Sequence, residues 1–288
     1  MRIRETERPP KIKFHIPSGS AYTRLKTIQN LNLHTICAEA LCPNIGECSG
    51  RGEAAFLILG DTCTRNCLYC AVKHGIPHPI DEKEPQRLAI AAASLNMRHV
   101  VITSPTRDDL EDGGASQFAI TTKKLREKLP HCTVELLVPD FAECMESAVN
   151  IISSAKPDVL NHNIEVTRNL FQELRPMGNY DLSLALLSYA ASIGNTVKSG
   201  LMVGVGESIN DVLETLNDLR KTGCSGITVG QYLPPNKESF TAKKYYTESE
   251  FDFIKQEALH MGFTAVYAGT HIRSSYNAAN MLTPKHKA

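Results

Sequence analysis

The chain has 288 residues, of which 42% are hydrophobic and 22% charged, the composition of an ordinary globular protein with a sizeable core. Its 31 basic and 31 acidic side chains cancel, which argues against nucleic acid or an anionic membrane surface as a partner. No apolar run is long enough for a transmembrane helix, and the charged, proline-rich start lacks the apolar core of a secretion signal, so we expect a cytoplasmic protein.

Apolar runs alternate with helix-like stretches along most of the chain. Residues 1–30 are expected to be an extension that packs on the main body. Strands are predicted at 54–60, 99–104, 132–139, 159–165, 195–204 and 226–233, and a final short run follows at 264–269. Helices are predicted at 85–97, 115–129, 141–154, 166–174, 181–193, 208–222 and 247–261.

This alternation predicts an α/β fold with parallel strands and right-handed crossovers. Six strand–helix units are too few for a closed eight-unit barrel, which leaves a doubly wound sheet or, as we prefer, an open, partial TIM-like barrel. We expect three parts: an N-terminal extension at 1–50, the barrel at 51–262 and a C-terminal extension at 263–288.

Polar residues concentrate where the predicted strands end. Because the carboxyl ends of parallel strands form one mouth, these residues are expected to meet there. They are Thr103, Ser104, Asn161, His162, Asn163, Glu165, Lys198, Ser199, Gly230, Gln231 and Tyr232. The segment CTRNCLYC (63–70) follows the first predicted strand and belongs to the same mouth.

Nine cysteines in a chain without a secretion signal indicate metal binding or catalysis rather than disulfides. Cys132, Cys144 and Cys224 are scattered, and we expect them to be small buried hydrophobic residues. The other six form two triplets: Cys37, Cys42 and Cys48, then Cys63, Cys67 and Cys70.

The second triplet has the spacing CxxxCxxC on one loop. Structural zinc sites are closed by four ligands and commonly pair two CxxC motifs, so a zinc site is the weaker alternative. Three thiolates can hold three corners of a cubane iron–sulfur cluster and leave one iron open for a small molecule. The pattern therefore favours a catalytic cluster.

This spacing after a first barrel strand resembles the radical S-adenosylmethionine (SAM) superfamily. The resemblance implies a [4Fe–4S] cluster on Cys63, Cys67 and Cys70 whose open iron binds the amino and carboxylate groups of SAM. Electron transfer from the cluster then cleaves SAM to a 5′-deoxyadenosyl radical that abstracts hydrogen. The contacts to SAM are expected from Thr103, Ser104, Asn161, Asn163, Glu165, Lys198 and Glu207.

The first triplet, CAEALCPNIGEC (37–48), and several further motifs resemble the lipoyl synthase family over roughly residues 35–280. The further motifs are TSPTRDDLEDGG (103–114), PDF (139–141), NHNIE (161–165), KSGLMVGVGE (198–207), TVGQYLPP (228–235) and RSSY (273–276). The resemblance implies an auxiliary [4Fe–4S] cluster that is consumed as the sulfur donor.

The ligands implied for the auxiliary cluster are Cys37, Cys42, Cys48 and a serine of RSSY. The residues alone do not separate Ser274 from Ser275, but the family pattern favours Ser275, the serine before the tyrosine. A serine oxygen is a harder ligand than a thiolate, so its release from iron would open the cluster, which gives Ser275 a catalytic role.

The implied activity is insertion of two sulfur atoms at C6 and C8 of an octanoyl group on a lysine of a lipoyl carrier domain, either a 2-oxoacid dehydrogenase E2 or the glycine cleavage H protein. A ferredoxin- or flavodoxin-type electron donor and a cluster-delivery protein are implied as well. The alternatives are another radical SAM sulfur insertase of the biotin synthase type, a methylthiotransferase, for whose extra domains the chain has no room, and a non-catalytic iron–sulfur or zinc scaffold.

Overall fold

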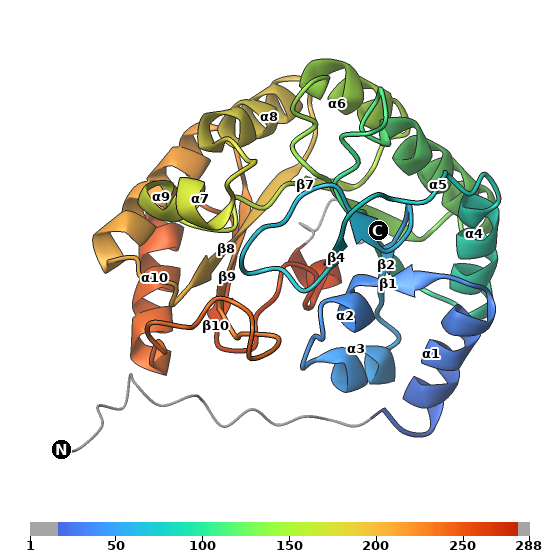
Figure 1. The fold of residues 1–288 in the computed structure, drawn as a ribbon, viewed down its shortest axis with the longest axis horizontal. Coiled ribbons are helices and arrows are strands. Elements are labelled where there is room, and N and C mark those ends of the chain that lie inside the picture. Colours follow the sequence, from blue (N-terminus) through green and yellow to red (C-terminus); the bar gives the residue numbers. More distant parts are fainter. Residues whose placement is uncertain (1–16, 282–288) are drawn as a thin grey trace.

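One strongly curved sheet forms the centre of the computed structural model, which describes residues 17–281 (Figure 1). Within this range the strand order is β1-β2-β5-β6-β7-β8-β9-β10. The strands are β1 (His34–Thr35), β2 (Ala55–Leu57), β5 (His99–Thr103), β6 (Thr133–Leu137), β7 (Val159–Asn161), β8 (Val197–Val203), β9 (Gly226–Gln231) and β10 (Ala265–Gly269). A separate parallel pair consists of β3 (Thr62–Cys63) and β4 (Lys73–His74).

The helices are α1 (Ser20–Asn30), α2 (Ile36–Glu39), α3 (Ile45–Arg51), α4 (Glu84–Ser94), α5 (Ala115–Lys128), α6 (Met145–Ser154), α7 (Arg168–Leu174), α8 (Tyr180–Ser192), α9 (Ile209–Lys221) and α10 (Glu248–His260), with a short 3-10 turn η2 (Ala278–Met281). Helices α4, α5, α6, α8, α9 and α10 form an arc around the outside of the sheet, and α2 and α3 lie at its open side (Figure 1). The seven predicted helices are confirmed as α4 to α10 to within a few residues. α1, α2 and α3 are additional.

The expected α/β fold and open barrel are confirmed. Every neighbouring pair from β2 to β10 is parallel, and β1 alone runs antiparallel, against β2. Within the described residues, the two edge strands β1 and β10 are not hydrogen-bonded to each other, so the barrel stays open. All six predicted strands exist, but each is shorter than expected, β2 and β7 most of all, and the final short run at 264–269 forms the edge strand β10.

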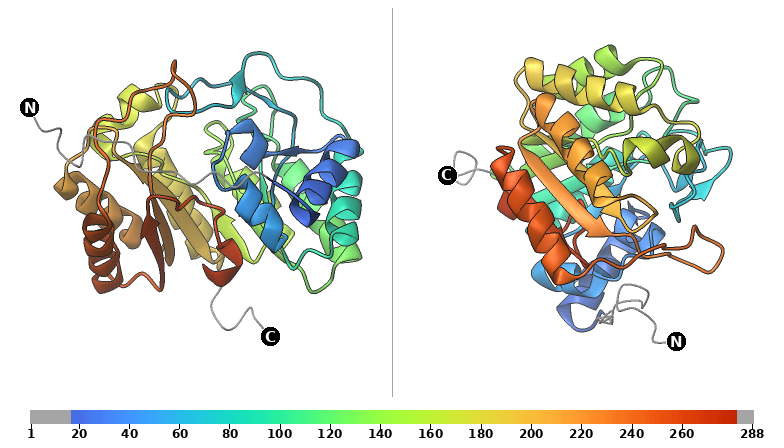
Figure 2. Two further views of the ribbon diagram at one scale, coloured as in Figure 1. Left: turned by 90° about the horizontal axis from the view of Figure 1, so that it is seen from below. Right: turned by 90° about the vertical axis from the view of Figure 1, so that its left-hand side faces the viewer.

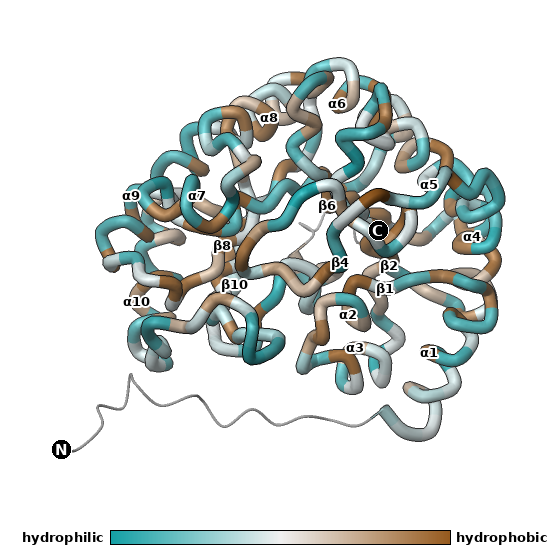
Figure 3. Tube along the Cα trace, in the orientation of Figure 1, coloured by the Kyte–Doolittle hydropathy of each residue, from teal (hydrophilic) through white to brown (hydrophobic). Residues whose placement is uncertain are grey.

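Side chains alternate between the two faces of the strands, as the pleat requires. On β5, Val100 and Ile102 belong to the large hydrophobic core beneath the helices, whereas Val101 belongs to a small inner group with Ala55 and Ala278. Figure 3 shows the complementary pattern on the outer helices, whose traces alternate between hydrophobic and hydrophilic residues. The main core therefore lies outside the barrel wall, and the barrel interior is free to carry chemistry.

The C-terminal segment lies beside α2 and α3 at the open side of the barrel (Figures 1 and 2). The amide of Asn44 donates to the carbonyl of His271 at 2.7 Å, which joins segments that are far apart in sequence. Of the scattered cysteines, Cys132 and Cys224 are buried as expected and Cys144 is partly exposed. No helix among residues 17–281 is both long and apolar enough to traverse a bilayer.

Candidate active site

The CTRNCLYC loop leaves the carboxyl end of β2 and crosses the barrel mouth. Its backbone is held by its own thiols, since Cys63 Sγ accepts from the amide of Arg65 at 3.4 Å and Cys70 Sγ from the amide of Val72 at 3.4 Å. The amide of Leu68 donates to the carbonyl of Leu174 at 3.0 Å, which ties the loop to α7. All three cysteines thus lie on one braced loop at the mouth.

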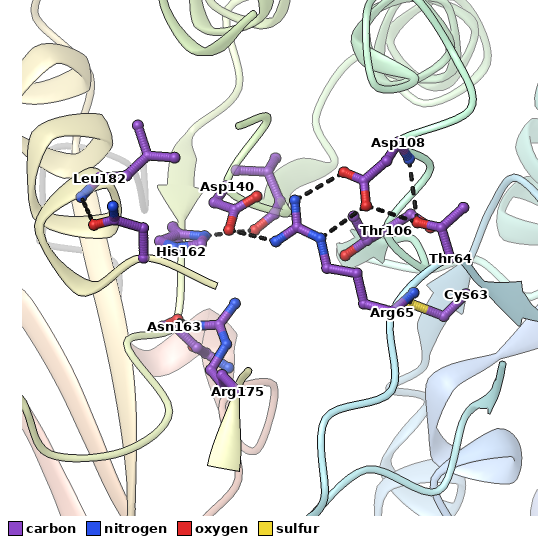
Figure 4. A network of polar contacts seen from close by, with 12 residues as sticks. Cys63, Thr64, Arg65, Thr106, Asp108, Asp140, His162, Asn163, Arg175 and Leu182 are labelled. Atoms are coloured by element: carbon purple, nitrogen blue, oxygen red, sulfur yellow. Dashed lines mark hydrogen bonds and ion pairs between the residues drawn. The ribbon is translucent and has the colours of Figure 1, made fainter. Parts of the chain in front are cut away.

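Arg65 fixes this loop to the loops that follow β5 and β6 (Figure 4). Its guanidinium forms a two-pronged pair with Asp108, with both N···O distances 2.8 Å, and reaches Asp140 Oδ2 at 2.6 Å. The side chains of Arg65 and Asp140 are only 5% and 1% exposed, so these charges neutralise each other out of water. Arg65 therefore shapes the cysteine loop from within.

Arg107 braces the other end of the same loop. Its guanidinium, 2% exposed, donates to the carbonyl of Leu59 at 2.9 Å and to the carbonyl of His78 at 3.1 Å. It also pairs with Asp109 at 2.8 Å. Arg107 of the charged TRDD run is thus a buried brace for the cysteine loop, whereas the carboxylates of Asp108 and Asp109 are partly exposed and pair with arginines.

Arg175 supplies positive charge beside the cysteines. It favours the ionised forms of Cys67, Tyr69 and Glu165, although burial outweighs it and raises the pKa of all three groups. Glu165 stands in a left-handed backbone conformation, φ 71°, and accepts from Asn163 Nδ2 at 3.0 Å. A carboxylate, an amide and a guanidinium thus lie close to the second cysteine triplet.

Several polar atoms around this mouth are buried yet find no partner among residues 17–281. They are Ser104 Oγ, Asp140 Oδ1, Asn161 Oδ1, His162 Nε2 and Arg175 Nε. Buried polar groups are nearly always hydrogen-bonded, so unmet donors and acceptors gathered at one mouth suit a polar ligand. The donor set fits a zwitterionic nucleoside such as SAM, with the three thiols of the cysteine loop beside it.

His162 is neutral in this setting. It is 2% exposed, its Nδ1 bonds the carbonyl of Val138 at 2.8 Å, and burial together with Arg175 lowers its pKa to about 4. Figure 4 places it between Asp140 and Asn163.

Glu207 closes the glycine-rich loop after β8. Its carboxylate accepts from the amides of Gly204 at 2.6 Å, Val205 at 2.9 Å and Gly206 at 3.1 Å, and from Tyr246 Oη at 2.8 Å. Gly204 has φ 99°, and an added Cβ would lie 2.4 Å from the carbonyl oxygen of Lys244. Glu207 thereby sets the loop shape, and its predicted contact with SAM stays a prediction.

Lys198 and Asn161 face the barrel interior and bind the RSSY segment. Lys198 Nζ donates to Glu135 Oε1 at 2.8 Å and to the carbonyl of Ser274 at 2.6 Å. Asn161 Nδ2 donates to Glu135 Oε1 and to Ser274 Oγ, both at 2.8 Å. Thr103, the last residue of β5, is buried, and its strand is separated from the strand of Asn161 only by β6. The predicted SAM contacts of Thr103, Asn161 and Lys198 stay predictions.

A small cavity, partly open to solvent, gathers residues of the first triplet and of RSSY. Cys37 from α2, Cys48 from α3 and Ser275 line it, together with His99 and Val101 of β5, Glu53, Ala54, Ala55 and Ala278. Cys42 lies close enough to Cys37 to help raise its pKa. The sulfur and hydroxyl donors of this wall fit an iron–sulfur cluster.

Burial disfavours the thiolate forms of Cys37 and Cys48. It raises the pKa of Cys37 to about 11 and that of Cys48 to about 12, although Arg51 Nη2 donates to Cys48 Sγ at 3.5 Å. At the other triplet, burial raises the pKa of Cys70 to about 12. Iron ligation at these thiols therefore releases protons. Among residues 17–281, no three His, Cys, Asp or Glu side chains are arranged to hold one metal ion.

The two cysteine sets lie at opposite ends of the barrel interior. His99 and Val101 of β5 line the cavity of the first triplet, whereas Thr103 and Ser104 end the same strand next to the CTRNCLYC loop. Two strand residues rise about 7 Å, so the two places lie a short distance apart along β5.

Sequence reasoning did not find the residues that hold these sites in place. Glu135 lies inside β6 and Arg175 directly after α7, and neither belongs to a local pattern of the kind used to find sites. His99 begins a strand and carries an unpartnered Nε2 among the described residues. One signal in the sequence could have pointed to Glu135: it is a charged residue inside the otherwise apolar strand TVELL.

Comparison with protein families gives two matches. Residues 57–219 match the radical SAM superfamily, and residues 2–42 match the N-terminal domain of lipoyl synthase of the radical SAM family. The superfamily match covers most of the barrel and implies a [4Fe–4S] cluster and SAM as cofactors.

Solved structures support the fold. SuiB of Streptococcus suis bound to S-adenosylmethionine superposes with a TM-score of 0.60 at 13% identity, over 91% of this chain and 59% of that one. Methylornithine synthase superposes with a TM-score of 0.55 at 15% identity, over 77% of this chain and 75% of that one. At these identities the likeness concerns the fold alone.

Curated relatives are much closer in sequence. The lipoyl synthase of Dichelobacter nodosus is 45% identical over 94% of this chain and 85% of its own length. The lipoyl synthase of Oleidesulfovibrio alaskensis is 45% identical over 96% of both chains. The chain therefore belongs to the lipoyl synthase family of the radical SAM superfamily, and it is an enzyme, a sulfurtransferase.

Proposed function

We propose that the enzyme inserts two sulfur atoms, at C6 and C8 of an octanoyl group carried on a lysine of a lipoyl carrier domain, and that the sulfur comes from an auxiliary [4Fe–4S] cluster. The observation that carries this proposal is the placement of two cysteine triplets at the two ends of one barrel interior. A carbon chain between them would have a hydrogen-abstracting cofactor on one side and a sulfur source on the other.

Cys63, Cys67 and Cys70 would hold the first cluster, with SAM in the polar mouth beside Arg175. When bound, the clusters and SAM supply hydrogen abstraction and the sulfur atoms. The protein's own part is to position these groups. Arg65 and Arg107 fix the cysteine loop. The atoms of Ser104, Asn161 and Arg175 that have no partner among the described residues would bind a polar ligand. The SAM contacts proposed from sequence are Thr103, Ser104, Asn161, Asn163, Glu165, Lys198 and Glu207.

Cys37, Cys42, Cys48 and Ser275 would hold the auxiliary cluster. Ser275 is favoured over Ser274 because Ser275 lines the cavity with Cys37 and Cys48, whereas the Ser274 hydroxyl is engaged on both sides by Asn161 and Asn163 at 2.8 Å. A serine oxygen that leaves iron more readily than a thiolate would expose the cluster for sulfur donation.

The octanoyl chain would lie along the apolar inner wall next to the auxiliary site. This wall contains Leu137 of β6, which packs against Ala55, Val101 and Ala278, three residues that also line the cavity of the first triplet. The carrier domain, an E2 domain or an H protein, would dock at the rim. A ferredoxin- or flavodoxin-type protein would deliver electrons, and a cluster-delivery protein would rebuild the auxiliary cluster.

The three-part organisation is also proposed. Residues 1–50 and 263–288 would carry the auxiliary ligands on either side of the 51–262 barrel. The hydrogen bond between Asn44 and His271 supports joint action of the two extensions.

The test is mass spectrometry of an octanoyl-lysine carrier domain after anaerobic incubation with reconstituted enzyme, SAM and a reductant. The expected product has gained two sulfur atoms. Deoxyadenosine without sulfur gain would redirect the search to another substrate, of the biotin synthase type for example. Neither product, from protein shown to contain both clusters, would favour a non-catalytic iron–sulfur scaffold and overturn the proposal.

A further inference from the structure

The RSSY segment is bound on both sides of Ser275. Ser274 and Tyr276, its two neighbours in the chain, each make side-chain hydrogen bonds to a different part of the molecule. Ser275 makes none with any of residues 17–281 and instead lines the cavity of Cys37 and Cys48. Alternate residues of one short segment thus have different tasks.

Ser274 is attached to the barrel wall by three hydrogen bonds. Its hydroxyl accepts from Asn161 Nδ2 and donates to Asn163 Oδ1, each at 2.8 Å. Its carbonyl accepts from Lys198 Nζ at 2.6 Å. Hydroxyl and carbonyl are therefore fixed together, which sets both the position and the direction of the backbone that leads into Ser275.

The wall that holds Ser274 is itself rigid. Lys198 pairs with Glu135 at 2.8 Å, and the two side chains are 3% and 1% exposed. Glu135 also accepts from Asn161 at 2.8 Å. A buried ion pair on two central strands tolerates few other geometries, since either charge alone would be costly to bury.

Tyr276 is attached to the helix that carries Cys48. Its hydroxyl donates to Glu47 Oε1 at 2.9 Å, and the guanidinium of Arg51 lies 5.0 Å from its ring centroid. Arg51 pairs with Glu47 and also donates to Cys48 Sγ at 3.5 Å. One side of Ser275 is thus tied to the barrel and the other to a cysteine-bearing helix.

We propose that Ser274 and Tyr276 are positioning residues that present Ser275 to the auxiliary cluster: Lys198, Asn161 and Asn163 hold Ser274, and Glu47 and Arg51 hold Tyr276. This inference rests on the proposed function, which makes Ser275 an iron ligand. A weak oxygen ligand is held at iron more firmly when the backbone on both sides of it is fixed. Groups that orient metal ligands commonly govern how firmly the metal is held.

The test measures how fast a ferrous chelator, bathophenanthroline, removes iron from the auxiliary cluster. The full-length chain with Cys63, Cys67 and Cys70 replaced by alanine is the parent, so that only the auxiliary cluster is loaded. Loss of the serine ligand exposes one iron, and we expect Ser275→Ala to release iron about tenfold faster than the parent. Mössbauer spectra of ⁵⁷Fe-loaded protein independently show whether the signal of the oxygen-ligated iron is lost.

Ser274→Ala removes only one hydroxyl, and we expect its iron release to approach that of Ser275→Ala. Ser274→Thr keeps the hydroxyl and should restore the parent rate and the Mössbauer signature. Tyr276→Phe should give an intermediate rate, because Ser274 remains held. Lys198→Met should release iron about as fast as Ser274→Ala. If the Lys198→Met protein does not fold, the comparison of Ser274→Ala with Ser274→Thr tests the inference.

Matched controls come from α8. Ser183 is buried with an unpartnered hydroxyl among the described residues, and Tyr189 exchanges hydrogen bonds with Asn150 at 2.9 and 3.1 Å. Ser183→Ala and Tyr189→Phe should release iron at the parent rate. A change as large as that of Ser274→Ala would mean a general loss of stability and overturn the inference.

The two proposals fail differently. If Ser275→Ala releases iron at the parent rate, Ser275 is not a ligand, and the proposed ligand set and this inference are both wrong. If Ser275→Ala is fast while Ser274→Ala and Tyr276→Phe match the parent, the ligand set stands and the positioning role is wrong.

Discussion

At the residue scale, buried charges hold the cysteine loop. Arg65 meets two carboxylates from two different loops, and its planar guanidinium satisfies both through three hydrogen bonds. Asp140 is 1% exposed and keeps a second oxygen without a partner among residues 17–281. A compact ammonium cannot span the same three acceptors.

Arg65→Lys should therefore lower the free energy of unfolding of the cluster-free protein by about 2 kcal/mol, because charge-assisted hydrogen bonds are lost while the charge remains. Urea denaturation under anaerobic conditions measures this. The matched control is Arg168→Lys, since Arg168 is 52% exposed and also pairs with two aspartates, Asp181 and Asp218. The control should cost about 0.5 kcal/mol or less. Equal losses in both variants would refute the role assigned to Arg65.

His162 makes stability depend on pH. Its pKa falls from 6.5 to about 4 in the folded protein, chiefly through burial and then through Arg175. The unfolded chain therefore binds the proton first, and stability is lost as pH falls from about 6.5 through about 4. His162→Gln can still donate to the carbonyl of Val138, and we expect it to lose less stability than wild type between about pH 7 and about pH 5. Urea midpoints at the two pH values provide the comparison; parallel losses would show that His162 does not titrate in this way.

At the element scale, helix starts are set by local capping. Ser208 and Asp211 form a reciprocal capping box at the start of α9, and Thr247 and Glu250 form one at the start of α10. α10 packs on β10, the strand that precedes the RSSY segment. The stability of this last helix therefore contributes to the edge from which that segment starts.

Thr247→Ala should destabilise the protein by about 1 kcal/mol, because the amide of Glu250 loses its acceptor. Thermal unfolding of the cluster-free chain measures the change. Ser154→Ala, at the exposed end of α6 where the hydroxyl only returns to the carbonyl of Ile151, is the control and should leave the melting temperature nearly unchanged. An unchanged melting temperature for Thr247→Ala as well would rule out a stabilising cap.

The same local signals explain which elements could be predicted. Helices starting near Ser208 and Thr247 were predicted within one residue because caps act over four residues. The predicted end of β2 was wrong because the apolar run continues beyond the paired strand to Leu59, where φ is 66° and the chain turns. The predicted end of β7 was wrong because the mostly polar stretch after Asn161 leaves the strand and turns at Glu165, where φ is 71°. α2 spans only four residues and has no periodicity to detect.

The site was predictable to a similar degree. Cysteine spacing and polar strand ends pointed to the two ligand sets, because both are local patterns in the chain. The partners that hold them, such as Glu135 with Lys198 and Arg65 with Asp140, are 63 and 75 residues apart. Which residues form such pairs depends on the order of the strands in the sheet. That order cannot be found from a local pattern in one sequence.

At the scale of the whole molecule, the two cysteine sets are held by different residues. The CTRNCLYC loop is held by Arg65 and Arg107 within the barrel mouth, whereas Cys37 and Cys48 lie on α2 and α3 and meet the C-terminal segment. Either set can be removed without touching the residues that hold the other. The two proposed clusters should therefore be separable by mutation.

Cys67→Ala is expected to abolish SAM cleavage, because the open-iron cluster loses one of three ligands. Cys42→Ala should retain SAM cleavage but insert no sulfur, because the donor cluster is lost while the mouth is intact. Chromatography of deoxyadenosine and mass spectrometry of the octanoyl carrier domain, run on the same samples, separate the two activities. Cys224→Ala, which removes a buried thiol outside both sets, is the control and should retain both. Sulfur insertion by Cys42→Ala would show that the sulfur comes from elsewhere, and loss of SAM cleavage in both variants would show that the two sites form one indivisible unit.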